Sequence, residues 1–327
     1  MKVLVCGGAG YIGSNMTALL AAEGHQPTVF DNFSKGHRSA VAGAEVVTGD
    51  LSDYDLLLDT LKDRRIEAVM HFAAWIEVGE SVQQPLKYYR NNTSNTQNLL
   101  SAMEAAGVGK FVFSSTAAVY GMPATIPITE ETAKAPINPY GESKWAVERM
   151  CHYQSQTGKL HYAALRYFNA CGAGSNGRLG EDHRPESHLI PLIIQAAMGK
   201  RPDIKVFGTD YDTADGTCIR DYIHIDDLCR AHLLALGRLE DQAEMVYNLG
   251  NGQGYSVRQV IDTVKRVSGK DFKVTETPRR PGDPAILTSD ATKARTELGW
   301  SPAKGELETM VETAWKWHTD HPEGYPD

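Results

Sequence analysis

The chain has 327 residues, of which 42% are hydrophobic, and its 33 basic and 41 acidic side chains give a net charge of −8. A chain of this size buries roughly three-quarters of its unfolded surface and exceeds the size of a single core, so we expect two lobes. No basic stripe offsets the negative charge, which excludes nucleic acid and membrane surfaces as expected partners.

The cysteines and the N-terminus indicate the compartment. The five cysteines are an odd number and include no CxxC pair, which fits reduced thiols better than a disulfide framework. The first apolar run, residues 3–6, is too short for a signal-peptide core, and no stretch reaches the roughly eighteen apolar residues of a spanning helix. We therefore expect a cytoplasmic protein.

Short apolar runs alternate with helix-length segments through the first half of the chain. The expected strands are residues 3–6, 28–30, 45–48, 68–72, 110–113 and 161–166. The expected helices are residues 12–23, 53–64, 81–106 and 139–157. Strands without polar alternation, separated by helices, predict an α/β fold with a Rossmann-type doubly wound parallel sheet, whose ligand lies at the carboxyl ends of the strands.

After about residue 168 the pattern changes to glycine-rich and proline-punctuated loops. Expected helices at 226–238, 256–268 and 306–318 and an expected strand at 245–249 keep this part structured. We predict a Rossmann domain at residues 1–168, rejoined by parts of 220–250, and a smaller mixed α/β lobe at residues 169–327.

A glycine cluster follows the first strand and opens a helix, and it reads Gly7-Gly8-Ala9-Gly10-Tyr11-Ile12-Gly13-Ser14. Glycines there permit a tight turn and let backbone N–H groups reach a pyrophosphate at the helix N-terminus. Asp31 ends the second strand, where its carboxylate can accept from both ribose hydroxyls and repel a 2′-phosphate. The combination predicts NAD as the cofactor, while Lys35 and Arg38 lie near enough to leave NADP open.

Hydroxyl and amine groups at two later positions indicate acid–base chemistry. Ser114 and Thr116 follow the fifth strand, and Tyr140 and Lys144 open a helix. Residues four apart share a helix face, so the Lys144 ammonium and a positive nicotinamide ring would lower the pKa of the Tyr140 phenol and make it a general base. Thr116 would relay or orient the proton. Without the dinucleotide signature, an amphipathic surface pair beside a hydroxyl-rich turn would be the better interpretation.

At these residues the chain resembles the extended short-chain dehydrogenase/reductases and, within them, the UDP-galactose 4-epimerases, also called UDP-glucose 4-epimerases. The resemblance covers nearly the whole chain. Its motifs in the first half are GGAGYIGSN, DNFSKGHRS, GDLSD, HFAAWIEVGES, YYRNNTSNTQNLL, FSSTAAVYG and NPYGESK. The more specific motifs of the second half are LRYFNACGA, GEDH, ESHLIPLI, FGTDYDTADGTCIRDYIHIDDL, YNLGNGQGYSV, RRPGD and HPEGYPD.

The resemblance implies roles for individual residues, in three groups. The catalytic group is Thr116, Tyr140 and Lys144. The group implied for NAD is Gly7, Gly10, Tyr11, Ile12, Gly13, Asp31, Asn32, Asp50, Leu51, Phe72, Ala73, Ala74, Asn91, Ser114, Tyr140, Lys144 and Tyr167. The group implied for a nucleotide sugar is Thr116, Asn169, His188, Leu189, Phe207, Arg220, Arg280, Asp283 and Leu287.

Some of these assignments have competing explanations. The two arginines offer planar forks for a diphosphate and Phe207 offers a face for uracil, but Arg220 could pair locally with Asp221, and Phe207 could be a core residue. His183, Glu186 and His188 carry metal-ligand atoms, yet their spacing matches no common zinc pattern and hydride chemistry needs no metal, so no metal site is expected.

The chain departs from the family pattern at a few positions. Ile76 stands where many members carry a lysine near the cofactor, and Thr116 stands where some members have serine. Leu287 matches a pocket position whose bulk in the family governs acceptance of N-acetylated sugars, and leucine is intermediate in size.

The residues after Thr116 favour one reaction over its neighbours. Related dehydratases carry an acidic pair there and decarboxylases a glutamate, whereas this chain has Ala117 and Ala118. The resemblance therefore implies reversible interconversion of UDP-galactose and UDP-glucose by oxidation at carbon 4, turning of the 4-keto sugar and hydride return. A 4-epimerase of another UDP-sugar (glucuronate, pentose or N-acetylhexosamine) stays an alternative, and a dehydratase or a non-catalytic NAD sensor fits less well. The family also implies a homodimer through the helices expected at 81–106 and 139–157.

Overall fold

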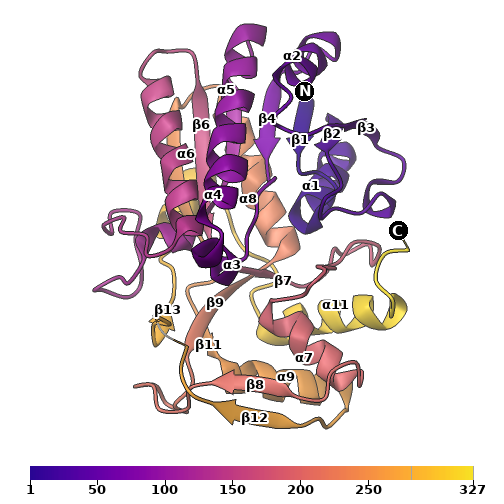
Figure 1. The fold of residues 1–327 in the computed structure, drawn as a ribbon, viewed down its shortest axis with the longest axis vertical. Helices are drawn as coiled ribbons and strands as arrows, with labels where there is room; N and C mark the ends of the chain where they lie inside the picture. The colour runs from indigo at the N-terminus through magenta and orange to yellow at the C-terminus, as the bar shows by residue number, and fades with distance from the viewer. Residues whose placement is uncertain (281, 327) are drawn as a thin grey trace.

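The computed structural model describes residues 1–280 and 282–326 and places them in two lobes (Figure 1). The larger lobe is built on a seven-stranded sheet of order β10-β6-β5-β4-β1-β2-β3, in which all neighbouring strands are parallel. Its strands are β1 (Lys2–Cys6), β2 (Gln26–Asp31), β3 (Glu45–Thr48), β4 (Ala68–His71), β5 (Lys110–Thr116), β6 (His161–Tyr167) and β10 (Glu244–Leu249). The Rossmann-type α/β fold is confirmed.

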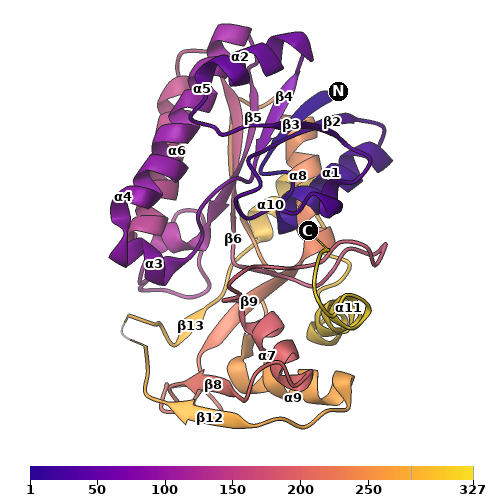
Figure 2. The same cartoon turned by 45° about the vertical axis from the view of Figure 1, so that its right-hand side comes forward.

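Helices cover both faces of this sheet (Figure 2). One face carries α1 (Tyr11–Ala22), α8 (Ile225–Arg238) and α10 (Thr292–Leu298), and the other carries α2 (Tyr54–Asp63), α5 (Asn95–Ala106) and α6 (Pro139–Ser155). Successive side chains of β1 enter opposite cores, Val3 and Val5 one of them and Leu4 and Cys6 the other. A strand buried on both faces favours apolar side chains at successive positions, which explains the unbroken apolar runs of the sequence.

The prediction of a single helix over residues 81–106 is wrong. The segment is divided into α3 (Val78–Gln83), α4 (Pro85–Tyr88), a π-helical turn at Tyr89–Ser94 and then α5. Pro85 breaks the helix because its ring lacks an N–H and pushes the preceding residue out of the helical region, and Gln84 accordingly has φ −131° and ψ 60°. The π turn is held by side chains, since Asn92 donates to the Trp75 carbonyl and to the Ser143 hydroxyl.

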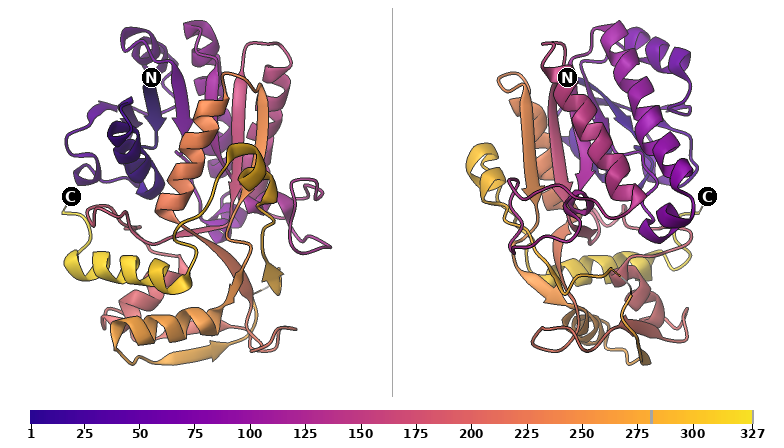
Figure 3. Two further views of the ribbon diagram at one scale, coloured as in Figure 1. Left: turned by 180° about the vertical axis from the view of Figure 1, so that it is seen from behind. Right: turned by 60° about the vertical axis from the view of Figure 1, so that its left-hand side comes forward.

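In the described residues, the smaller lobe contains two short sheets and three helices around a core of its own (Figure 3). One sheet has the order β11-β9-β13, with β7 also paired to β9, and the other joins β8 to β12. The strands are β7 (Asn169–Cys171), β8 (Ile204–Phe207), β9 (Ile219–His224), β11 (Gly254–Ser256), β12 (Val274–Thr277) and β13 (Ile286–Leu287). The helices are α7 (Leu189–Ala197), α9 (Val257–Ser268) and α11 (Leu307–Asp320). Among the described residues, no helix is both long enough and apolar enough to cross a membrane.

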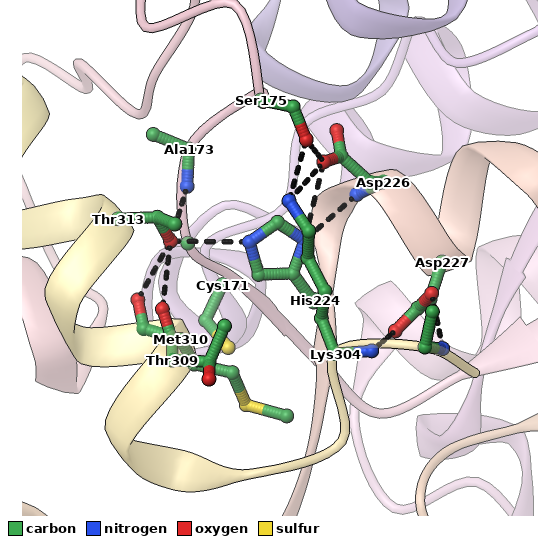
Figure 4. Close-up of polar contacts among 12 residues, drawn as sticks. Cys171, Ala173, Ser175, His224, Asp226, Asp227, Lys304, Thr309, Met310 and Thr313 are labelled. Atoms are coloured by element: carbon green, nitrogen blue, oxygen red, sulfur yellow. Dashed lines mark hydrogen bonds and ion pairs between the residues drawn. The ribbon is translucent and has the colours of Figure 1, made fainter.

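A buried histidine joins the lobes where β9 leads into α8 (Figure 4). The side chain of His224 is fully buried, its Nδ1 accepts from the Asp226 N–H at 3.1 Å, and its Nε2 lies 3.1 Å from the Thr313 hydroxyl of α11. Burial lowers the pKa of His224 to about 4, so the ring is neutral and Nε2 carries the proton. At the same junction between the lobes, the Lys304 ammonium pairs with the Asp226 carboxylate at 2.7 Å.

Candidate active site

A cavity of about 950 Å³ lies where the carboxyl ends of β1, β4 and β5 meet the smaller lobe. All residues predicted for the site line this cavity apart from Phe207. The position agrees with the rule that ligands of doubly wound sheets bind beyond the carboxyl ends of the strands.

The glycine turn after β1 is shaped for an anionic group. Gly7 has φ +76°, and a Cβ there would lie 2.7 Å from Ala73 Cα, while a Cβ at Gly13 would lie 2.7 Å from Gly8 Cα. At Gly10 the nearest atom to a Cβ would be the Gly7 oxygen at 3.5 Å, so the turn is open on that side. No side chain caps the start of α1. Its first N–H groups and positive dipole end therefore fit a pyrophosphate.

Asp31 is held at the carboxyl end of β2 by the same turn. Its buried carboxylate accepts from the Ala9 N–H at 2.9 Å and from the Phe33 N–H at 2.8 Å. A carboxylate has about four acceptor positions, so sites remain for the two ribose hydroxyls of a dinucleotide. Burial raises the pKa of Asp31, and the two N–H groups work in the opposite direction. Turn and carboxylate together fit the adenosine half of NAD.

The predicted catalytic residues come together from β5 and α6. Pro139 begins α6, and the Asn138 side chain caps it by accepting from the Gly141 N–H at 2.9 Å. Tyr140 and Lys144 thus lie one turn apart at the start of the helix, facing the cavity beside Thr116. The buried Lys144 ammonium donates to the Ser114 carbonyl at 2.8 Å.

Lys144 and a positive nicotinamide ring were expected to lower the pKa of Tyr140. The protein's own groups do not lower it. Burial raises the pKa of this phenol, and the hydrogen bond with the Thr116 hydroxyl only partly opposes that shift. Burial also lowers the pKa of Lys144 to about 7, because within the described residues its ammonium contacts a carbonyl and the Phe113 ring and pairs with no carboxylate. The protonation of Tyr140 and Lys144 would therefore respond to the charge of a bound ligand.

Two arginines approach the cavity from the smaller lobe. Arg220 of β9 donates to the Asp283 carboxylate at 2.9 Å and to the Pro284 carbonyl at 2.9 Å. The Arg280 guanidinium lies 3.8 Å from the centre of the Phe207 ring. Leu287 of β13 is paired in register with Arg220 and also lines the cavity. Two planar guanidinium groups and an apolar wall in one cavity suit a diphosphate that carries a base and a sugar.

The structure excludes the local explanations given above for Arg220 and for Phe207. Asp221 is fully buried and accepts from the Asn251, Gly252 and Ser289 N–H groups, so it is not the ion-pair partner of Arg220. Phe207 is half-buried beneath Arg280 and is neither a core residue nor a lining residue of the cavity.

Trp75 lines the cavity and was not predicted for the site. The Lys87 ammonium lies 3.9 Å and the Lys35 ammonium 5.6 Å from the centre of its ring. The Asn92 side chain holds the Trp75 backbone through both its N–H and its carbonyl. Lys35, which also lines the cavity, thus brings positive charge to the wall where Ile76 replaces the common lysine. The motif containing Trp75 was visible, but its lysine partners are distant in sequence.

Residues 3–250 match the family model described as the NAD dependent epimerase/dehydratase family. The chain belongs to this family. It is 51% identical over 327 residues to a UDP-glucose 4-epimerase of Halalkalibacterium halodurans, covering 99% of this chain and 98% of the relative. A crystal structure of UDP-glucose 4-epimerase from Brucella ovis in complex with NAD superposes with a TM-score of 0.94 at 45% identity, covering 99% of this chain and 98% of that one.

A further relative of the family was solved with both kinds of ligand. It is a UDP-glucose-4-epimerase from Stenotrophomonas maltophila with bound NAD and formylated UDP-arabinopyranose, similar at a TM-score of 0.95 and 40% identity over 99% of each chain. In the present family member, Ala117 and Ala118 line the cavity at the start of a short 3-10 helix, Ala117–Tyr120. The two places expected to hold the acid–base pair of a dehydratase therefore carry methyl groups.

Proposed function

We propose that this chain interconverts UDP-galactose and UDP-glucose reversibly, as an NAD-dependent 4-epimerase. One observation carries the proposal. A hydroxyl–phenol–ammonium trio, Thr116, Tyr140 and Lys144, lines the same cavity as the two arginines, and the segment after Thr116 offers no carboxylate. The relatives named UDP-glucose 4-epimerase, similar over nearly the whole chain, support the same function.

The division of labour follows the two lobes. Residues 1–168, with the segment around β10, hold the cofactor through the glycine turn and Asp31, and residues 169–327 hold the UDP-sugar. NAD bound here would accept a hydride from sugar carbon 4 and return it. Tyr140 removes the proton of the 4-hydroxyl, with Thr116 orienting it, and gives the proton back to the ketone oxygen after the sugar has turned.

The arginines make the turning of the sugar compatible with tight binding. Arg220 and Arg280 hold the diphosphate, which takes no part in the chemistry, so the hexose itself needs few directional contacts. The 4-keto sugar can then present its other face to the same cofactor without leaving the cavity. No second acid or base is needed, because the proton removed and the proton returned belong to the same oxygen.

The decisive experiment gives purified protein UDP-galactose without added cofactor and follows UDP-glucose formation by NMR. We expect interconversion from either side to one common ratio, with NAD released only on denaturation. Absence of interconversion in cofactor-replete protein would overturn the proposal. A panel of UDP-glucuronate, UDP-pentoses and UDP-N-acetylhexosamines in the same assay tests the alternative substrates, for which Leu287 sets the available room.

We also propose that the enzyme is a cytoplasmic homodimer. All five cysteines are free and buried, which suits a reducing compartment. Apolar side chains are exposed along α3 and α4, Val78 by 46%, Val82 by 62% and Leu86 by 80%, and Tyr153 on the adjacent α6 is 60% exposed. Exposed apolar side chains of this kind support an interface, and Val82, Leu86 and Tyr153 lie in the segments that the family resemblance implied.

A further inference from the structure

Four side chains of one loop converge on a point beside the cavity. They are Glu181, His183, Glu186 and His188, in the irregular segment between β7 and α7. One ligand atom from each lies within 4.8 Å of every other. The spacing ExHxxExH, which matches no common zinc pattern along the chain, is brought together by the folding of the loop.

Three of the separations between these atoms lie near those of ligands around one metal ion. Around zinc, with bonds of about 2.0 to 2.2 Å, tetrahedral donors lie about 3.3 to 3.6 Å apart. His183 Nδ1 lies 3.2 Å from Glu181 Oε1 and 3.6 Å from Glu186 Oε1, and His188 Nδ1 lies 3.9 Å from Glu186 Oε1. His188 Nδ1 and Glu181 Oε1 are in direct contact. A cation at the centre requires the His188 imidazole and the Glu181 carboxylate to move apart.

The charges of the cluster are compatible with a bound cation. The side chains of Glu181 and Glu186 are each only 4% exposed, and two buried carboxylates require compensating positive charge. His183 Nδ1 is buried and makes no hydrogen bond in the described part of the chain, although it faces both carboxylates. Either two protonated imidazoles, or two neutral imidazoles with one divalent cation, balance the charge of these two carboxylates.

The surroundings provide an entry path and a reason for the site. His188 is 44% exposed and lines the cavity together with Glu181 and His183. The His183 ring also packs edge-on against Tyr11 of α1, with ring centres 6.4 Å apart, and the Tyr11 hydroxyl donates to the Gly172 carbonyl at 2.7 Å. The loop thus connects the cofactor turn to His188 and Leu189 at the entrance of α7.

We propose that Glu181, His183, Glu186 and His188 form a binding site for one divalent transition-metal ion, Zn²⁺ in preference to Mg²⁺. Imidazole with carboxylate suits zinc, whereas magnesium prefers six oxygens. With four protein ligands the site is closed and structural. The ion takes no part in proton or hydride transfer and braces the loop that forms one wall of the cavity. This site is additional to the proposed epimerase function and does not depend on it.

The test uses the full-length protein with its cofactor, treated with a chelator, freed of it and titrated with Zn²⁺ alone. We expect one tight zinc equivalent per chain, and Mg²⁺ in large excess should not compete. Loss of an outer partner of a metal ligand costs 10- to 100-fold in affinity, so Glu186→Gln and His183→Ala, which remove ligands, should weaken binding at least about 100-fold. His152→Ala is the matched control, because this exposed histidine also lies 3.0 Å from a carboxylate, that of Glu244.

The outcomes separate the site from its alternatives. Equal zinc binding by wild type and both ligand variants would mean an adventitious ion only and would overturn the proposal. Absence of zinc binding by the wild type would overturn it too, and would mean that protonated imidazoles balance the carboxylates. If a variant fails to fold, the wild type decides by substitution with Co²⁺, whose visible spectrum is intense in a tetrahedral site and weak in an octahedral one. None of these measurements requires turnover, so their failure leaves the epimerase proposal standing.

Discussion

Tyr140 is the residue on which the proposed chemistry depends most directly. Replacing it by phenylalanine removes one oxygen and leaves the ring that fills the cavity wall. General acid–base catalysis contributes about 10²- to 10⁴-fold, so we expect kcat of Tyr140→Phe to fall by that factor with NAD still bound. Initial rates with UDP-galactose and the NAD content of the denatured protein check both parts. Tyr54→Phe, at a tyrosine that does not line the cavity, should leave both unchanged, and near-normal turnover by Tyr140→Phe would place the base elsewhere.

The buried Lys144 ammonium, which the proposed activity requires, should lower the stability of the cofactor-free protein. Burial lowers the pKa of its ammonium from the ordinary value of 10.5 to about 7, so folding at neutral or lower pH must bury a charge. The unfolded chain holds this proton up to about pH 10.5 and the folded chain only up to about pH 7. Stability therefore rises with pH between these values, and the full cost is present below pH 7.

Replacing Lys144 by methionine removes that cost. We expect Lys144→Met without cofactor to be more stable at pH 6 by about 2 to 4 kcal/mol, with the advantage shrinking as pH rises above 7. Urea unfolding of both proteins between pH 6 and pH 9 measures the difference. Turnover of the variant should be nearly abolished. An advantage that stays constant with pH would contradict the assignment of the lowered pKa.

Individual site residues differed in how far the sequence revealed them. Gly7, Gly13 and Asp31 were predictable because their roles follow from short spacings next to recognisable strands. Trp75 was not, because it acquires a place at the cavity only through Asn92 and Lys87, whose positions depend on an unexpected π turn. Glu181 was missed for a similar reason, since only the folded loop brings it to His183 and His188.

At the scale of elements, β5, β6 and α6 are joined by a buried ion pair behind the catalytic residues. Arg166 of β6 and Glu148 of α6 are each 3% exposed and lie 2.5 Å apart, and the Ser115 hydroxyl of β5 donates to the same carboxylate. The Arg166 guanidinium also donates to the Tyr120 hydroxyl at 2.8 Å. The pair thus fixes the helix that carries Tyr140 against the strand that carries Thr116.

Removing one partner should cost far more than removing an exposed pair. Arg166→Met leaves Glu148 buried without a counter-charge, and we expect a loss of about 3 to 5 kcal/mol in the free energy of unfolding. Lys159→Met breaks an exposed pair with Glu104 and should change the free energy of unfolding little, because water screens both charges. Chemical denaturation of both variants gives the comparison. The double variant Arg166→Met with Glu148→Leu should recover much of the loss, and if it does not, packing rather than charge is responsible.

Sequence patterns identified those helices and strands whose residues are buried in a regular pattern. The central strands β1, β4 and β5 of the parallel sheet are buried and contain unbroken apolar runs, whereas β8 and β12 form a two-stranded sheet with mixed exposure. Helix α7 was hidden by Pro191, which reads as a helix breaker. Here the proline lies in the first turn, where its missing N–H has no partner to lose.

For the whole molecule, the proposed dimer gives the sharpest prediction. Leu86 is 80% exposed on α4, and a lysine there would place an unpaired charge inside an apolar interface. We expect wild type to have the mass of two chains by light scattering and Leu86→Lys to weaken association at least about 100-fold. Met122→Lys, at a 54% exposed apolar residue outside these helices, should remain dimeric. A wild-type mass of one chain would contradict the proposed assembly.

Strand β10 has a consequence for synthesis on the ribosome. It forms the edge of the large sheet beside β6, yet the residues from 168 to 243 lie between the two strands in the chain. At about 5 to 20 residues per second, the outer edge of β6 stays bare for roughly 4 to 15 seconds after it has been made. A bare apolar edge strand pairs readily with other chains. The nascent enzyme therefore needs protection from aggregation until the last strand of its cofactor sheet emerges.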